Sequence, residues 1–249
     1  MPPPGRLYGI GLGPGDPDLL TVKAVKLLQA APVVSYFAKA GRCGIARGIA
    51  APWLQGAPQE EPLHYPMTTE RHFADPAYVE TLGAFYAEAA ERLGRHLAAG
   101  RDVALICEGD PLFYGSFMHL YVRLRERFEV VIVPGVTGMS GCWAAAGAPM
   151  TWGDDVLTVV PGTLDAGLLR ERMAATDALV VMKLGQNLGK VRSALAATGL
   201  LERALYVERG TMAQERVMRL VDKPSDEAPY FAVVLVPGHG RAPGREGGP

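Results

Sequence analysis

The chain has 249 residues and a formal net charge of −1; hydrophobic residues make up 49% of it and charged residues 20%. This composition excludes an intrinsically disordered chain. Because 25 Lys and Arg are balanced by 26 Asp and Glu, no overall positive charge favours a nucleic acid as the partner.

The cysteines and the N-terminus indicate the compartment. The three cysteines are too far apart for a CxxC pair or a dense disulfide framework, which favours a reducing environment. The N-terminus MPPPGRLYGIG lacks the basic and apolar regions of a signal peptide, and no apolar run approaches the ~18 residues of a membrane span. We therefore expect a soluble, cytoplasmic protein. The cysteines are Cys43, Cys107 and Cys142.

The first half of the chain repeats a strand, a turn and a helix. Short apolar runs predict strands, and apolar residues at helical spacing predict the segments between them as helices. Residues 56–76 are rich in proline and polar residues and predict one short strand and an irregular loop. This alternation predicts an open, largely parallel α/β sheet. The expected strands are 6–11, 32–37, 103–107 and 129–133, and the expected helices are 18–31, 45–54, 76–99, 116–128 and 137–147.

The second half contains more strand than helix, which predicts a mixed sheet and a second α/β domain. Turn residues and two adjacent acids interrupt the pattern at 147–155 and mark the best domain boundary. We expect one α/β domain at 1–147, a second at 148–238 and a disordered tail at 239–249. The expected strands are 156–162, 178–185, 204–210, 215–222 and 230–238, and the expected helices lie near 165–175 and 187–198.

Three glycine-containing loops follow strands of the first half, where ligands usually meet an α/β sheet. They are GLGPGDP at 11–17, EGDPLFYG at 108–115 and VPGVTGMSGCWA at 133–144. Each also has a structural interpretation: Asp16 and Asp110 can cap the helices that follow, and the small residues of the third loop can serve close helix packing. Carboxylates at a strand tip favour a site in the second loop.

The first loop does not fit a dinucleotide or phosphate site. Asp16 stands where the dinucleotide fingerprint needs its third glycine, and Phe37 ends the next strand where an acid is expected. No Gly-Lys-Ser/Thr follows. A nicotinamide-dependent oxidoreductase is therefore improbable.

Two strand ends of the second half, at 182–187 and 208–212, also carry glycine and polar residues. Together with the first three loops they can line one cleft. This disfavours the interpretation of the chain as a non-catalytic binding module. No HExxH or GxSxG motif is present, so we expect no metal site and no serine nucleophile. Arg71 and Arg209 lie where this cleft would open, and arginine suits the recognition of carboxylates.

The three first-half loops together resemble the S-adenosylmethionine-dependent tetrapyrrole methylase family. They are GLGPGDPDLLTVKAV, CEGDPLFYGSFMHL and VVPGVTGMSGCWAAAGAPM, and the resemblance extends over residues 6–238. It implies two α/β domains with the active-site cleft between them, a homodimer, and S-adenosylmethionine as cofactor with S-adenosylhomocysteine as product.

Four further segments narrow the resemblance within the family to enzymes that methylate carbon 20 of precorrin-2, giving precorrin-3A in cobalamin biosynthesis. A cobalt-precorrin-2 substrate is an alternative, and a macromolecule-modifying methylase of the diphthine synthase or ribosomal RNA type is a weaker one. The segments are PMTTE at 66–70, MKLGQNLGKVR at 182–192, RGTMAQERVM at 209–218 and PYFAVVLVPG at 229–238.

The resemblance also implies site residues. Related uroporphyrinogen methylases carry an acid at the end of the second strand, where this chain has Phe37, so no base carries over; Glu108 and Tyr36 are the candidates for a base. Met67, Arg71 and Arg209 are expected to bind the substrate. The expected cofactor residues are Pro14, Gly109, Asp110, Phe113, Tyr114, Thr137, Gly138, Met182, Leu184, Gly210, Thr211 and Met212.

Overall fold

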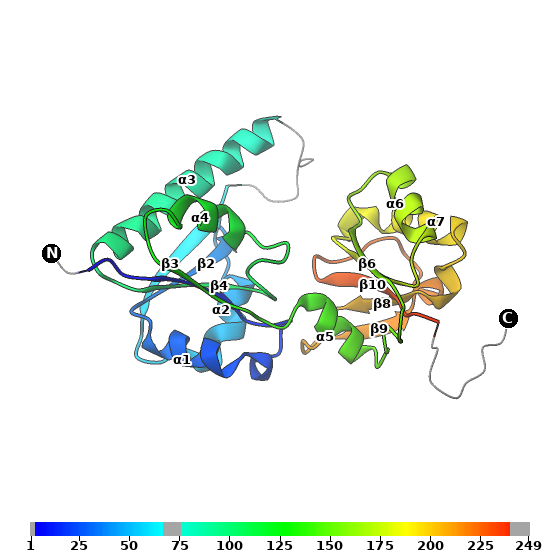
Figure 1. Ribbon diagram of the computed structural model, residues 1–249, viewed down its shortest axis with the longest axis horizontal. Helices are drawn as coiled ribbons and strands as arrows, with labels where there is room; N and C mark the ends of the chain where they lie inside the picture. Colours follow the sequence, from blue (N-terminus) through cyan, green and yellow to red (C-terminus); the bar gives the residue numbers. More distant parts are fainter. Residues whose placement is uncertain (1–2, 67–75, 240–249) are drawn as a thin grey trace. The chain divides into compact units, whose positions relative to one another are not determined.

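The structure is a computed structural model that describes residues 3–66 and 76–239. The chain forms two compact units, Met1–Thr137 and Gly138–Pro249 (Figure 1). The division precedes the boundary predicted after residue 147, because helix α5 (Gly138–Ala145) contacts strands of the second unit. Met67 and Arg71, and all of the expected tail except His239, lie outside the described residues.

The first unit is built on a parallel five-stranded sheet in the order β3-β2-β4-β1-β5. Gly11 pairs with Cys107 and Ile10 with Val133, so the carboxyl ends of β1, β4 and β5 lie at one edge. The predicted parallel sheet is thus confirmed. The strands are β1 (Leu7–Gly11), β2 (Val33–Lys39), β3 (Gln59–Tyr65), β4 (Val103–Cys107) and β5 (Val130–Val133).

Helices cover both faces of this sheet. Figure 1 shows α3 and α4 on one face and α1 and α2 on the other. Thr21 caps α1 by accepting from the N–H of Ala24 at 3.2 Å, and Gly100, at φ +75°, follows α3 in the left-handed conformation typical of helix ends. The helices are α1 (Val22–Ala30), α2 (Ile45–Ala50), α3 (Pro76–Ala98) and α4 (Phe117–Leu124).

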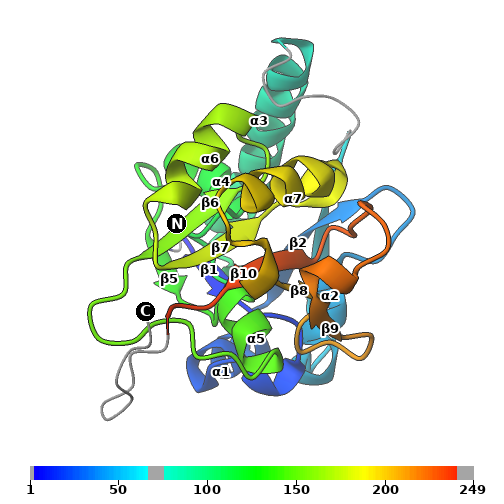
Figure 2. The ribbon, with the colours of Figure 1, turned by 90° about the vertical axis from the view of Figure 1, so that its right-hand side faces the viewer.

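The second unit is built on a mixed sheet in the order β6-β7-β10-β8-β9, in which only β6 and β7 are parallel. Helices α6 and α7 pack in one apolar cluster, and α5 packs in another that includes Cys142. Figure 2 shows α6 and α7 on the opposite side of the sheet from α5. This confirms the predicted mixed α/β sheet. The elements are β6 (Leu157–Pro161), α6 (Ala166–Ala174), β7 (Ala178–Met182), α7 (Leu188–Ala197), β8 (Leu205–Glu208), β9 (Arg216–Arg219) and β10 (Ala232–Val236).

Short 3-10 helices connect several of these elements: Pro17–Leu19, Ala51–Trp53, Gly185–Asn187, Leu201–Arg203 and Leu220–Asp222. Among the residues that the structure describes, no helix has the length and apolar character that crossing a membrane requires.

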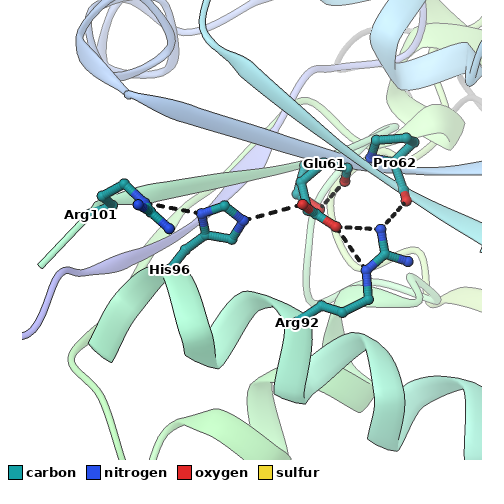
Figure 3. A network of polar contacts seen from close by, with 6 residues as sticks. Glu61, Pro62, Arg92, His96 and Arg101 are labelled. Carbon is teal, nitrogen blue, oxygen red and sulfur yellow. Dashed lines mark hydrogen bonds and ion pairs between the residues drawn. The ribbon is translucent and has the colours of Figure 1, made fainter. Parts of the chain in front are cut away.

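A polar network fastens α3 to the edge strand β3 (Figure 3). The Glu61 carboxylate accepts from Arg92 Nε at 2.8 Å and lies 3.2 Å from His96 Nε2. Arg101 Nε donates to His96 Nδ1 at 3.2 Å, so Nδ1 is an acceptor and the imidazole proton lies on Nε2, facing Glu61. Burial opposes ionisation of Glu61, but the hydrogen bonds from His96 and Arg92 outweigh it and lower the pKa of the carboxyl.

Replacing the Glu61 carboxylate should destabilise the protein in a pH-dependent way. We expect Glu61→Gln to lower the free energy of unfolding by about 2 kcal/mol at neutral pH, since hydrogen bonds to charged groups contribute roughly that much. Because the pKa of Glu61 is lowered in the folded state, its stabilisation is present above the unfolded carboxyl pKa of ~4.3 and is lost as the pH falls through the folded value.

Urea unfolding of both proteins at neutral and acid pH measures this difference. It should shrink on acidification, and a difference independent of pH would contradict the account. Glu129→Gln is the control: it removes an ion pair with Arg6 that is more than half exposed, so its effect should be much smaller.

Candidate functional site

Two loops of the first unit are joined by their main chains beyond the carboxyl ends of β1 and β4. The N–H of Leu12 donates to the carbonyl of Cys107 at 2.9 Å. Gly13 and Gly109 exchange two hydrogen bonds, of 3.3 and 2.7 Å, and form an isolated antiparallel bridge. The structure therefore brings together the first and second glycine loops that the sequence singles out.

The third loop packs against the other two so closely that side chains are excluded. A Cβ atom on Gly135 would lie 2.2 Å from the carbonyl oxygen of Gly109, and one on Gly11 would lie 2.6 Å from the same oxygen. Gly109 itself has φ +65°, in the left-handed region that favours glycine. These glycines let the backbones of the three loops pack directly against one another at the edge of the sheet.

Asp110 ties the second loop to the third. Its Oδ2 accepts from the N–H of Gly135 at 3.1 Å, and its Oδ1 accepts from the N–H of Leu112 at 2.9 Å. The predicted turn at Asp110 is therefore confirmed, together with a second, long-range contact, but Asp110 caps no helix, because α4 begins only at Phe117, after Ser116. Asp16 caps the 3-10 helix after the first loop, accepting from the N–H of Asp18 at 2.9 Å.

The other expected cofactor residues of this unit differ in exposure. Pro14 is buried, Phe113 is half-buried and Tyr114 is exposed. The rings of Phe113 and Tyr114 meet edge to face with centroids 4.8 Å apart. Thr137 is half-buried at the end of the third loop. Phe113, Tyr114 and Thr137 therefore keep some exposed area in the loops after β4 and β5.

The end of β7 contributes mainly backbone. Leu184 is fully buried in the core of the second unit, so a ligand could meet only its main chain. Met182 is half-buried, and its carbonyl accepts from the N–H of Gly162 at 2.6 Å. Gly138 begins α5, and a Cβ atom there would meet nothing within 4 Å.

The end of β8 forms a tight turn that contains Gly210, Thr211 and Met212. The N–H of Met212 donates to the carbonyl of Arg209 at 2.9 Å. Arg209 Nη1 donates to the carboxylate of Glu208 at 2.9 Å, while its side chain stays 37% exposed. The guanidinium expected to bind substrate is thus partly accessible and already held by one carboxylate.

Backbone strain is concentrated at these strand ends. Five non-glycine residues in the described part of the chain have a positive φ, and four of them follow β4, β7 or β8. Such conformations cost of order 1–3 kcal/mol and gather at functional sites. The sequence carries no signal for them, because none is glycine or asparagine. The four are Tyr114, Lys183, Arg209 and Thr211, and the fifth is Ala57.

Glu108 is half-buried and caps a helix. Its Oε1 accepts from the N–H of Ala46 at 3.0 Å, near the start of α2, where Gly44 offers no capping side chain. Burial raises the pKa of the Glu108 carboxyl. A raised pKa suits a group that exchanges protons near neutral pH. Glu108 can therefore both cap α2 and serve as the candidate base.

Tyr36 is poorly suited to act as a base. Its hydroxyl donates to Glu60 Oε2 at 2.7 Å, and Arg47 pairs with Glu60 Oε1 at 2.7 Å. Burial and the bond to Glu60 raise the pKa of Tyr36 to about 12. Phe37, where related enzymes carry an acid, stacks on Tyr65 with centroids 5.3 Å apart.

No group of three or more His, Cys, Asp and Glu side chains that could hold a metal ion occurs within residues 3–66 and 76–239. His119, whose sequence context predicts an ordinary helix-face residue, is exposed and stacks on Tyr86 with centroids 4.2 Å apart.

Comparison with known proteins identifies the family. Residues 6–221 match the Tetrapyrrole (Corrin/Porphyrin) Methylases. The chain is 56% identical to a precorrin-2 C(20)-methyltransferase from Sinorhizobium sp over 94% of this chain and 96% of that protein. It is 31% identical to the cobalt-precorrin-2 C(20)-methyltransferase of Salmonella typhimurium strain LT2 over 93% of this chain and 96% of that protein.

A solved structure agrees with these relatives. The uroporphyrin-III C-methyl transferase from Thermus thermophilus, complexed with S-adenosylhomocysteine, superimposes with a TM-score of 0.66 at 27% identity, over 93% of this chain and 97% of that one. The chain therefore belongs to the tetrapyrrole methylases and is a methyltransferase.

The glycine contact at the sheet edge can be tested by substitution. We expect Gly135→Ala to lower the free energy of unfolding by about 1–3 kcal/mol, because its methyl group would force apart the chains at Gly109 and Gly11. Chemical denaturation measures the loss. Gly83→Ala, in α3 with nothing within 4 Å of the added methyl, should be neutral or stabilising by up to ~1 kcal/mol; equal losses in both variants would contradict the account.

Proposed function

We propose that this chain transfers a methyl group from S-adenosylmethionine to carbon 20 of precorrin-2, giving precorrin-3A in cobalamin biosynthesis. The observation that carries the proposal is the 56% identity to a precorrin-2 C(20)-methyltransferase over almost the whole of both chains. Cobalt-precorrin-2 is the second candidate substrate, supported by the 31% identity to an enzyme named for it. The higher identity favours the metal-free substrate.

The residues at the strand ends fit S-adenosylmethionine. The contacts among Gly11, Gly109 and Gly135 hold the loops after β1, β4 and β5 against one another, and the Thermus relative is complexed with S-adenosylhomocysteine. We assign the cofactor to the residues that the family resemblance implies in the loops after β1, β4, β5, β7 and β8. The sequence leads us to expect a cleft between the two domains, and this cleft remains a prediction.

The chain contributes to methyl transfer chiefly by holding the two reactants in position. S-adenosylmethionine supplies a methyl group on a sulfonium, which is a good leaving group, so the step needs little acid or base assistance. Loops held rigidly by glycine contacts and by Asp110 can keep methyl and carbon in line. Such orientation supplies up to ~7–11 kcal/mol of barrier reduction.

Two side chains have further proposed roles. Carbon 20 exchanges a hydrogen for the methyl group, so a proton must leave, and we assign its acceptance to Glu108, whose pKa is raised by burial. Tyr36, with its pKa of about 12, would serve only as a donor. Arg209 is proposed to pair with a carboxylate of the tetrapyrrole. Met67 and Arg71 are also proposed to contact the tetrapyrrole. A cytoplasmic homodimer is the expected form.

The activity can be tested directly. Purified protein, methyl-labelled S-adenosylmethionine and precorrin-2 should give a product whose label NMR places at carbon 20. A parallel reaction with cobalt-precorrin-2 compares kcat/KM for the two substrates and should favour the metal-free form. Folded protein that methylates neither substrate at carbon 20 would reject the proposal.

Cofactor binding has a simpler test. S-adenosylhomocysteine at about 100 times its Kd should stabilise the protein by ~2.7 kcal/mol and raise its Tm. NAD should leave the Tm unchanged, since the dinucleotide fingerprint is missing. A shift with NAD alone would favour the oxidoreductase alternative.

Asp110→Ala separates cofactor binding from a purely structural role. The substitution leaves two backbone N–H groups without their acceptor and should weaken S-adenosylhomocysteine binding in calorimetry by about tenfold or more. It should also lower the free energy of unfolding by ~1–3 kcal/mol. Asp165→Ala is the matched control, because Asp165 also accepts from a backbone N–H, at the start of α6. The affinity of the control should equal that of the native protein; a loss of stability without loss of affinity in Asp110→Ala would show that Asp110 only holds the loops together.

A further inference from the structure

The turn 209–212 after β8 is held by groups outside the turn itself. The N–H of Arg209 donates to the carbonyl of Phe231 at 2.8 Å, which anchors the start of the turn next to β10. Gly210 packs against Cys142 on α5. The N–H of Thr211 donates to Glu215 Oε2 at 2.6 Å.

Three of the four backbone N–H groups of this turn therefore have acceptors within the protein, because the N–H of Met212 also donates, to the carbonyl of Arg209. A ligand at the turn cannot be bound through these N–H groups unless a contact within the protein breaks. The turn suits ligand groups that donate hydrogen bonds, such as an amino, ammonium or hydroxyl group, more than an anion.

The backbone of the turn also needs support. Arg209 has φ +49° and Thr211 has φ +70°, and neither is glycine. Residues stay in such conformations only where contacts with the surrounding structure hold them there. Glu208 supplies support at Arg209: its carboxylate is 11% exposed, accepts from Tyr206 Oη at 3.0 Å and holds the guanidinium at 2.9 Å.

Close packing fixes the middle of the turn. A Cβ atom on Gly210 would lie 3.0 Å from both the Cα and the Sγ of Cys142. Burial raises the pKa of that thiol to about 11, so it stays neutral at physiological pH. The contact is thus one of shape, and no charge is involved.

We propose that Glu208, Cys142 and Glu215 are positioning residues that hold the 209–212 turn in the conformation that binds the cofactor's hydrogen-bond donors. This inference rests on the proposed function, since that assigns the turn to S-adenosylmethionine. Glu215 offers the sharpest test because it is exposed, so its replacement leaves the core intact.

Glu215→Ala should free the turn without unfolding the protein. In the absence of ligand, the amide hydrogens of Gly210 and Thr211 should exchange faster, while the Tm changes little. The affinity for S-adenosylhomocysteine should fall about tenfold, because part of the binding free energy then orders the turn. KM for S-adenosylmethionine should rise by a similar factor with kcat nearly unchanged, as loss of uniform binding requires.

Two further variants complete the experiment. Glu215→Gln keeps a carbonyl acceptor for the N–H of Thr211 and should restore most of the affinity. Glu202→Ala removes another exposed carboxylate of the same unit, paired with Arg219 at 2.9 Å, and should bind as the native protein does.

The outcomes separate the two proposals. If the native protein binds S-adenosylhomocysteine and Glu215→Ala binds it equally well, the positioning role is wrong while the proposed function stands. If the native protein does not bind S-adenosylhomocysteine, the proposed function fails and the inference fails with it.

Discussion

The site of the first unit depends on the contact of three glycines at the carboxyl edge of its parallel sheet. The carbonyl oxygen of Gly109 occupies the space in which a Cβ atom of Gly11 or Gly135 would lie. Because β1, β4 and β5 are neighbours in the sheet, their loops emerge side by side and can touch only where side chains are missing. The loops after these three strands are thereby fixed relative to one another without a large contribution from side chains.

Asp110 adds the polar part of this arrangement. Its two oxygens satisfy N–H groups in two different loops, so a residue expected from its position to serve a ligand also fastens the surface on which the ligand would lie. The two functions support each other, since a ligand gains affinity when the groups that contact it are already held in place. Glu108 follows the same pattern, because its carboxylate closes the N-terminus of α2.

Much of this could be predicted from the sequence. Strand β4 was expected at 103–107 and is found at Val103–Cys107, because a short apolar run between turn residues has few alternatives. Pro76 and Gly100 marked the ends of α3, because proline is favoured at the first position of a helix and glycine just after its last. The partners of Glu61, Tyr36 and Glu108 were beyond prediction, since the contacts with Arg92, Glu60 and Ala46 join residues far apart in the chain.

The two units differ in how they hold their loops. This difference explains which supporting residues could not be predicted from the sequence. In the first unit glycine removes the steric obstacle, so the motif itself records the constraint. In the second unit Arg209 and Thr211 adopt left-handed conformations with side chains present, and the cost must be offset by contacts with Glu208, Glu215 and the carbonyl of Phe231, next to β10. A motif search finds the glycines of the first arrangement. The supports of the second become visible only when each backbone N–H of the turn is traced to its acceptor.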